Sequence, residues 1–490
     1  MNFKQSGESV LKIKTDLLVL GMFKGDKFSG SVKSVNEALG GVLKDLAGDE
    51  KFEGDLGKSV LLSSTFGKIW AKRVLLLGLG DKSRYSPDTV RKTGNLTAKK
   101  MRNVCTSFAF GREFCKGRGY VAALAEGVIL GSYEFNKYRT NNGPESEIEN
   151  VVILSENFKD KKFEEEIGLA KAVSESTCLT RDLVNEPPVY MTPSRLADIA
   201  SSIADEGDLK CEIFDLEEIK RRGMGGIVAV SSGSDEPPKF VHLTYEPHKT
   251  PKTTLAVVGK GITFDSGGLC IKPADSMRTM KMDMAGAAAV LGIMKTISRL
   301  KPSIRVHGLI SSSENMTGPA AYKPDDVIRA YNGKTIEVIN TDAEGRIVLS
   351  DALSYAVHLK VDEIIDLATL TGACMVALGT YTAGVMSNNQ KIVDRLNKAA
   401  EWAGEKIWQL PMDDELRPEI KSDVADIKNV GSRWGGAITA AMFLEHFVGE
   451  TPWAHLDIAG PAYSERDSNW NPKGGTGFGV RTVVSYIMQR

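Results

Sequence analysis

The segments that decide the fold are TTLAVV at residues 253–258, AGAAAVLGIMKTISRL at residues 285–300 and IRVHGLI at residues 304–310. The first and last are short apolar runs rich in β-branched residues, which is typical of buried strands. The segment between them is rich in alanine and long enough for a helix. A strand, a helix and a second strand in this order predict a parallel crossover within a sheet that is covered on both faces.

The same alternation extends in both directions along the chain. Towards the carboxyl terminus it predicts strands at residues 335–339 and 363–367 and a helix at residues 347–359. Towards the amino terminus it predicts strands at residues 17–20, 74–77 and 151–154. Ser86 and Pro87 are suited to begin a helix, as the N-cap and the first helical residue.

This pattern predicts an α/β protein of two domains. We expect a smaller α/β domain for assembly or regulation at residues 1–160, and a larger catalytic domain at residues 161–490 whose mostly parallel central sheet is covered by helices. The boundary falls in or just before a helix that reaches about Leu183 and is ended by the two prolines of Asn185-Glu186-Pro187-Pro188.

The bulk composition argues against several classes of protein. The 62 basic and 63 acidic residues give a formal net charge of −1, so the total charge does not point to a nucleic acid or an acidic membrane as partner. The six cysteines have no CxxC spacing, which argues against a disulfide framework and a thiolate zinc site. The amino terminus shows no signal peptide, and the longest apolar runs are shorter than the ~20 residues of a membrane span. We therefore expect a cytoplasmic protein.

Charged residues gather where two of the predicted strands end. The segments after Val258 and Ile339 supply these side chains: Lys260, Asp265, Lys272, Asp283, Asp342, Glu344 and Arg346. Taken singly, each is typical of a solvated surface residue, and Asp342 is a candidate cap for the helix that follows. Ligands of open α/β sheets bind beyond the carboxyl ends of the strands, so the convergence of these residues favours a functional site.

Clustered carboxylates repel one another unless a positive charge lies among them. Carboxylate oxygens suit divalent cations, and two ions ~3.5–4 Å apart can activate a water and polarise a carbonyl together. The six histidines form no HExxH pair, so a single-zinc site of the thermolysin type is not predicted. His455 lies on a predicted strand and is expected to be a core residue.

The motif NTDAEGR at residues 340–346 resembles the signature of the leucyl aminopeptidase family, which comprises the cytosol aminopeptidases and the bacterial aminopeptidase A group. Residues 258–272, MKMDMAG at residues 280–286 and DLATLTG at residues 366–372 resemble the same family. The resemblance covers the chain from Asn185 to the carboxyl terminus. The amino-terminal part has the size of the family's variable domain and no comparable signature.

The resemblance implies two metal sites that share ligands. Asp265, Asp342 and Glu344 would hold the more exchangeable ion, with help from the Asp342 carbonyl. Lys260, Asp265, Asp283 and Glu344 would hold the tighter ion. The implied ions are Mn²⁺ or Zn²⁺, with Mg²⁺ as a further candidate. Lys260 must be neutral to donate a lone pair, and neighbouring cations together with burial would lower its pKa.

The resemblance also implies the remaining catalytic roles. Lys272 would stabilise the oxyanion. Arg346 would hold a bicarbonate ion that accepts the proton of the attacking water. The residues expected to line the substrate site, with a preference for Leu-like side chains, are Met280, Asn340, Thr369 and Leu370. The free α-amine of the peptide would bind the tighter ion, so the enzyme would release single amino-terminal residues. The family implies a homohexamer, a dimer of trimers.

Two other functions compete with this interpretation. Residues 264–268 also resemble the nucleophile segment of trypsin-like serine proteases, with Ser266 as nucleophile, but that family is all-β. Some bacterial relatives of the aminopeptidases also bind DNA, and the amino-terminal domain is the place where a second, DNA-binding role would be sought. Its mixed charges do not point to one.

Overall fold

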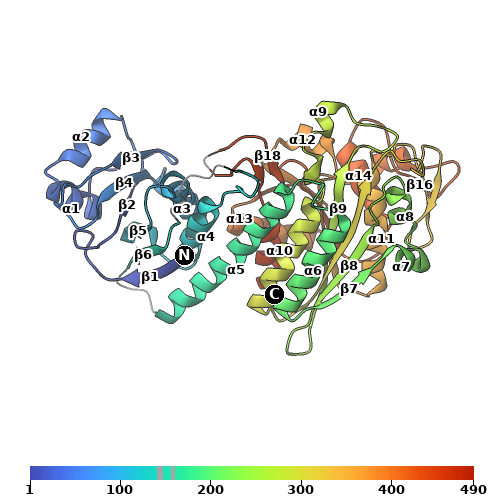
Figure 1. Ribbon diagram of the computed structural model, residues 1–490, viewed down its shortest axis with the longest axis horizontal. Coiled ribbons are helices and arrows are strands. Elements are labelled where there is room, and N and C mark those ends of the chain that lie inside the picture. Colours follow the sequence, from blue (N-terminus) through green and yellow to red (C-terminus); the bar gives the residue numbers. More distant parts are fainter. Residues whose placement is uncertain (141–146, 156–159, 469, 490) are drawn as a thin grey trace. The chain divides into compact units, whose positions relative to one another are not determined.

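The computed structural model describes residues 1–140, 147–155, 160–468 and 470–489. The chain forms two compact units (Figure 1). The amino-terminal unit comprises Met1–Glu175 and Asp467–Pro472, and the carboxyl-terminal unit comprises Ser176–Arg466 and Lys473–Arg490. The division falls within helix α5 (Asp160–Asn185), which ends just before the two prolines, as predicted. Within the described residues, no helix is both long and apolar enough to cross a membrane.

The amino-terminal unit is built on a six-stranded sheet in the order β1-β6-β5-β2-β4-β3, in which only the β3–β4 pair is antiparallel. Its strands are β1 (Asn2–Ser6), β2 (Leu17–Met22), β3 (Ser59–Leu62), β4 (Arg73–Gly78), β5 (Ser107–Phe110) and β6 (Asn150–Leu154). Alternate residues of β2 enter two separate apolar clusters, one on each face. This explains its unbroken apolar sequence.

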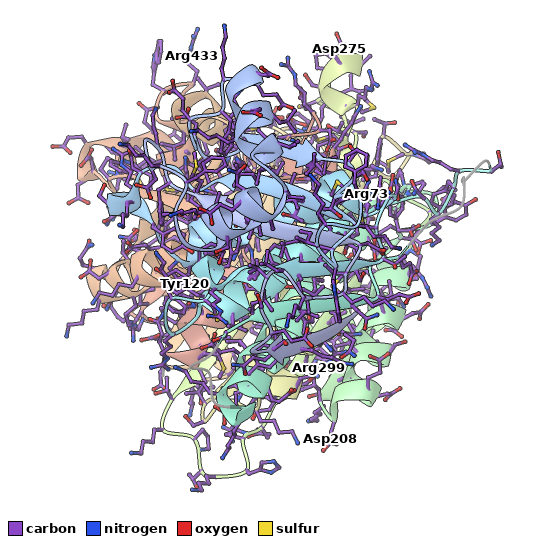
Figure 2. All side chains as sticks on the ribbon, turned by 90° about the vertical axis from the view of Figure 1, so that its left-hand side faces the viewer. Arg73, Tyr120, Asp208, Asp275, Arg299 and Arg433 are labelled. Carbon is purple, nitrogen blue, oxygen red and sulfur yellow. The ribbon has the colours of Figure 1, made fainter. Side chains whose placement is uncertain are left out.

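The helices of this unit are α1 (Gly30–Ala38), α2 (Val42–Asp49), α3 (Pro87–Met101) and α4 (Tyr120–Ser132). Helix α3 begins as the sequence predicts, because the Ser86 hydroxyl accepts a hydrogen bond from the Thr89 amide and Pro87 is the first helical residue. Figure 2 labels Arg73 and Tyr120, which are the first residues of β4 and α4.

The carboxyl-terminal unit has an eight-stranded sheet in the order β15-β14-β17-β13-β9-β10-β8-β7. Its strands are β7 (Lys210–Phe214), β8 (Lys239–Tyr245), β9 (Thr254–Asp265), β10 (Arg305–Asn315), β13 (Glu363–Ala368), β14 (Thr382–Ser387), β15 (Lys406–Gln409) and β17 (Trp453–Asp457). The four central strands, β17-β13-β9-β10, are parallel, and antiparallel pairs lie towards the edges. The predicted α/β class with a mostly parallel central sheet is confirmed.

Helices cover both faces of this sheet. Figure 1 shows α6 (Pro193–Gly207) and α10 (Ala285–Leu300) on one face, and α8 (Gly225–Ser231) and α11 (Glu344–His358) on the other. The remaining helices are α7 (Leu216–Arg222), α9 (Ala274–Met277), α12 (Gly372–Leu378), α13 (Gln390–Ala403), α14 (Gly436–Glu445) and α15 (Val480–Met488).

Two details of the predicted sheet were wrong. The segment after Val258 is not a loop, because β9 continues to Asp265 beside β10, which itself runs past Ile310 to Asn315. Pairing with neighbouring strands on both sides outweighs the low strand preference of the two glycines. The strand predicted at residues 335–339 is the shorter β12 (Thr335–Glu337), which pairs with β11 (Val327–Arg329) and β16 (Ile427–Lys428) in a separate sheet and is not a neighbour of β9.

Candidate metal centre

Lys260 is a buried charged group of the site. It lies within β9, its side chain is only 3% exposed, and its ammonium is 2.8 Å from carboxylate oxygens of both Asp283 and Glu344. It also donates to the Thr369 carbonyl at 3.1 Å. Burial opposes the charge, but Asp283 and Glu344 outweigh it and raise the pKa of Lys260. To act as a metal ligand, Lys260 would have to lose this proton.

Lys272 forms the second cationic contact, on the other side of the carboxylates. Its ammonium lies 2.9 Å from Asp265 Oδ2 and 2.6 Å from Asp342 Oδ1. Burial lowers the pKa of Lys272, but the neighbouring carboxylates outweigh burial and raise it. The two lysines thus divide the carboxylates into one pair around Lys260 and another around Lys272.

The carboxylates come from three parts of the chain. Asp265 is the last residue of β9, and Asp283 follows the short helix η3 (Met280–Met282). Glu344 begins α11, whose N-cap is Ala343, so Asp342 does not cap this helix. The contacts that bring them together therefore belong to the folded chain and not to a continuous loop.

Three of these carboxylates, those of Asp265, Asp342 and Glu344, can each place an oxygen within 4.8 Å of the other two. Burial, followed by the charge of Asp265, raises the pKa of Glu344 to about 8. Burial is also the main cause that raises the pKa of Asp283 to about 6 and raises the pKa of Asp342. In each case the cost of burying the carboxylate exceeds the stabilisation that the neighbouring lysines give its charged form.

The donor set fits divalent cations. Four carboxylates face two ammonium groups, which leaves a surplus of two negative charges when all are ionised. Glu344 Oε2 is buried and has no hydrogen-bond partner among the described residues. An orphaned carboxylate oxygen of this kind is expensive unless a cation takes its lone pairs.

Arg346 lies in the first turn of α11 and is 8% exposed. Its Nη1 donates to the Asn429 carbonyl at 2.8 Å, while its Nε is buried and has no hydrogen-bond partner among the described residues. Burial lowers the pKa of Arg346 to about 10. A buried guanidinium with an unused N–H is suited to hold an anion.

The predicted substrate residues lie around the same centre. Thr369 Oγ1 donates to Asp283 Oδ1 at 2.8 Å, and the Leu370 amide donates to Asp457 Oδ1 at 3.2 Å. Met280 begins η3, three residues before Asp283. The Asn340 side chain accepts a hydrogen bond from the Asp342 amide at 2.8 Å, and this contact stabilises the turn at residues 340–342.

Sequence reasoning missed the residues that fix these loops in place. Asp457, at the end of β17, accepts hydrogen bonds from the Leu370 amide and the Thr371 hydroxyl. Asn429 accepts from the Ile339 amide and donates to the Asn340 carbonyl. No sequence signal identified them, because these partners lie far away along the chain and most of them are backbone groups. They are recognised only once the fold places them.

Comparisons with known proteins show the family of this chain. A model of the "cytosol aminopeptidase family, catalytic domain" matches residues 178–484, and one of the same family's N-terminal domain matches residues 19–142. A probable cytosol aminopeptidase of Aquifex aeolicus is 46% identical over 495 residues, which cover 100% of this chain and 98% of that relative. The chain belongs to the cytosol aminopeptidase family. It is accordingly an aminopeptidase.

Two solved structures carry the cytosol aminopeptidase fold of this chain. A mutant of tomato leucine aminopeptidase superimposes with a TM-score of 0.92 at 37% identity, covering 100% of this chain and 97% of that one. The bottromycin maturation enzyme BotP in complex with Mn superimposes with a TM-score of 0.85 at 34% identity, covering 97% of this chain and 99% of that one.

The serine-protease alternative does not fit this family or the structure. The carboxyl-terminal unit is α/β, whereas that family is all-β. The Ser266 hydroxyl donates to the Asn315 carbonyl at 2.8 Å. His455 is a core residue, as predicted, and its buried Nδ1 lies 2.6 Å from Asp366 Oδ1.

Proposed function

We propose that this aminopeptidase is a two-metal enzyme that releases Leu and other mainly apolar residues from the amino termini of peptides. The observation that carries the proposal is the cluster of four carboxylates, three of them buried and that of Asp342 half-buried, with two surplus negative charges. Among the described residues, Glu344 Oε2 in this cluster has no hydrogen-bond partner. Lys260, Asp265, Asp283 and Glu344 would hold one divalent ion, and Asp265, Asp342 and Glu344 the other. When bound, such a pair supplies an activated water and polarises the scissile carbonyl.

Lys260 and Lys272 have different roles in this proposal. Lys260 would give up its proton and become a ligand, because cations bound to Asp283 and Glu344 would neutralise the two carboxylates that now hold the proton on it. Lys272 stays protonated. Cations that balance Asp265 and Asp342 would weaken the present ion pairs of Lys272, and its ammonium could then stabilise the oxyanion of the substrate.

Arg346 would hold an anion, which we propose to be bicarbonate and which would supply a base for the proton of the attacking water. The proposal assigns the carboxylates of the site to the cations, whereas among the described residues the Nε group of Arg346 is buried and has no hydrogen-bond partner. Met280, Asn340, Thr369 and Leu370 surround the amino-terminal residue of the substrate.

We further propose Mn²⁺ or Zn²⁺ as the working ions, a homohexamer as the assembly and the cytoplasm as the location. BotP, whose fold this chain shares, was solved with Mn. The hexamer and the location rest on the family. Sedimentation velocity on the purified chain would give the mass of the assembly directly.

The decisive experiment is hydrolysis of Leu-p-nitroanilide by metal-stripped protein, titrated with Mn²⁺ or Zn²⁺ beside an Asp342→Ala variant. We expect activity to return as about two ions per chain are added. The variant should remain inactive at the same metal concentrations. Acetyl-Leu-p-nitroanilide should not be cleaved, because it has no free α-amine. Equal cleavage of the acetylated and free substrates would refute the proposed exopeptidase site.

A further inference from the structure

Asn315 occupies an unusual position at the end of β10. The pairing of β10 with β9 shifts register between Ser313 and Asn315, so that Asn315 lies opposite Asp265. The Asn315 side chain is fully buried. Irregular pairing of this kind redirects a side chain, and here it turns an amide towards the carboxylates.

The side-chain amide of Asn315 joins the two chain segments that supply ligands. Its Nδ2 donates to Asp265 Oδ1 at 2.8 Å and to the Thr341 carbonyl at 3.0 Å. The backbone carbonyl of Asn315 in turn accepts from the Ser266 amide at 3.0 Å and the Ser266 hydroxyl at 2.8 Å. Asn315 therefore holds the end of β9 and the residue before Asp342 in a fixed relation to each other.

These contacts also determine how Asp265 is presented. Asp265 Oδ1 accepts from the Gly267 amide at 2.8 Å as well as from Asn315, so that oxygen is committed to protein donors. Asp265 Oδ2 faces the other way, towards Lys272 at 2.9 Å. The carboxylate torsion of an aspartate is soft, and without the Asn315 donor only the Gly267 amide would hold Oδ1 in this orientation.

We propose that Asn315 is a positioning residue of the metal centre: it selects the oxygen of Asp265 that meets the cations and fixes the Thr341–Asp342 segment opposite it. This inference rests on the proposed two-metal function. An amide is needed because Nδ2 carries two N–H groups and both are used. A carboxylate of the same size has no N–H, and at this position it would face two further acceptors.

The test is Mn²⁺ binding to metal-stripped protein, followed by the electron paramagnetic resonance signal of free Mn²⁺, in the wild type, Asn315→Asp and Asn315→Ser. The matched control is Asp351→Asn. Asp351 is a fully buried side chain that accepts from the Ile227 and Tyr331 amides at 2.9 and 2.8 Å, neither of which belongs to a proposed ligand. We expect Asn315→Asp to bind at least one ion about 10–100-fold more weakly, and the control to bind as the wild type does.

Kinetics give a second measurement that a merely structural role would not change in the same way. With Leu-p-nitroanilide at saturating Mn²⁺, Asn315→Asp should lose kcat with little change in KM. If Asn315→Asp does not fold, judged by its thermal transition, the smaller Asn315→Ser replacement carries the test, since it introduces no charge.

The outcomes separate the two proposals. If the wild type binds Mn²⁺ and the affinities of Asn315→Asp lie within twofold of the wild-type values, the positioning role is overturned, while the proposed metal centre is not affected. A wild type that binds no Mn²⁺ would overturn both. Equal weakening in Asn315→Asp and Asp351→Asn would overturn the positioning role, because the effect would then be a general one of core disruption.

Discussion

Gly345 offers a sharp test of the geometry around Lys260. It is the second residue of α11, and a Cβ atom at this position would lie 2.5 Å from Lys260 Cε and 2.6 Å from Nζ. Non-bonded carbon atoms normally rest ~3.5–4.0 Å apart, so the lysine would have to move by about 1 Å. It has no free direction in which to move, because Asp283, Glu344 and the Thr369 carbonyl enclose its ammonium.

The expected size of the Gly345→Ala effect follows from this displacement. A misplacement of ~1 Å at a reacting centre costs about 100-fold in rate. Folding should suffer less: overpacking costs ~1–3 kcal/mol, and alanine recovers about 1 kcal/mol through its better helix propensity. We therefore expect a folded enzyme whose kcat/KM is about 100-fold lower.

The assay is kcat/KM for Leu-p-nitroanilide with saturating Mn²⁺, together with the thermal unfolding midpoint. The control is Gly48→Ala in helix α2, where a Cβ would meet no atom within 4 Å. It should leave kcat/KM unchanged. A Gly345→Ala enzyme with wild-type kcat/KM would show that catalysis does not depend on the observed position of Lys260. That result would refute its proposed role as a metal ligand.

Further predictions concern the two proposed catalytic cations, the bound metals and acid stability. Lys272→Met should lower kcat by about 100–1,000-fold while Mn²⁺ still binds, as measured by single-substrate kinetics and metal titration. Arg346→Met should lower kcat by about 100-fold and abolish any response to added bicarbonate. Chelation should abolish activity reversibly and lower the unfolding midpoint, because ligands that bind only the folded state stabilise it. His242 and His307 are hydrogen-bonded to each other at 2.9 Å, and burial lowers the pKa of each from 6.5 to about 4. Between about pH 4 and pH 6.5 the unfolded chain therefore binds more protons than the folded chain. The free energy of unfolding should fall as the pH drops through this range, by up to ~1.4 kcal/mol per pH unit for each histidine. Denaturant titrations at several pH values should show that the free energy of unfolding of His307→Gln falls less steeply with decreasing pH than that of the wild type. An equal fall in both proteins would contradict the role given to the buried histidines.

The sequence predicts the fold class well because most of its elements are locally consistent. Apolar runs such as the one that forms β2 are buried on both faces, and the Ser86-Pro87 pair caps α3 as expected. Where prediction failed, tertiary pairing decided the outcome. The glycines after Val258 are typical of a loop, yet hydrogen bonds to β10 and β13 keep them in β9.

The candidate site was predictable as a set of residue types, and its geometry was not. Acidic and basic residues near predicted strand ends indicated a metal centre, and the structure brings the predicted carboxylates and lysines together. The sequence did not reveal that Lys260 belongs to a strand, or that β12 lies outside the main sheet. Nor did it reveal Asn315 and Asp457. Their partners Thr341 and Thr371 are 26 and 86 residues away along the chain and come close only in the folded structure.

The central claim is that the four clustered carboxylates of Asp265, Asp283, Asp342 and Glu344 hold two divalent cations. Anomalous diffraction from crystals soaked in Mn²⁺, recorded near the manganese edge, tests it most directly. We expect two peaks per chain within the cluster, both beside carboxylate oxygens of Asp265 and Glu344, with Asp283 next to one and Asp342 next to the other. Peaks that lie only elsewhere, or a cluster without anomalous density in crystals that bind Mn²⁺ at other sites, would contradict the account.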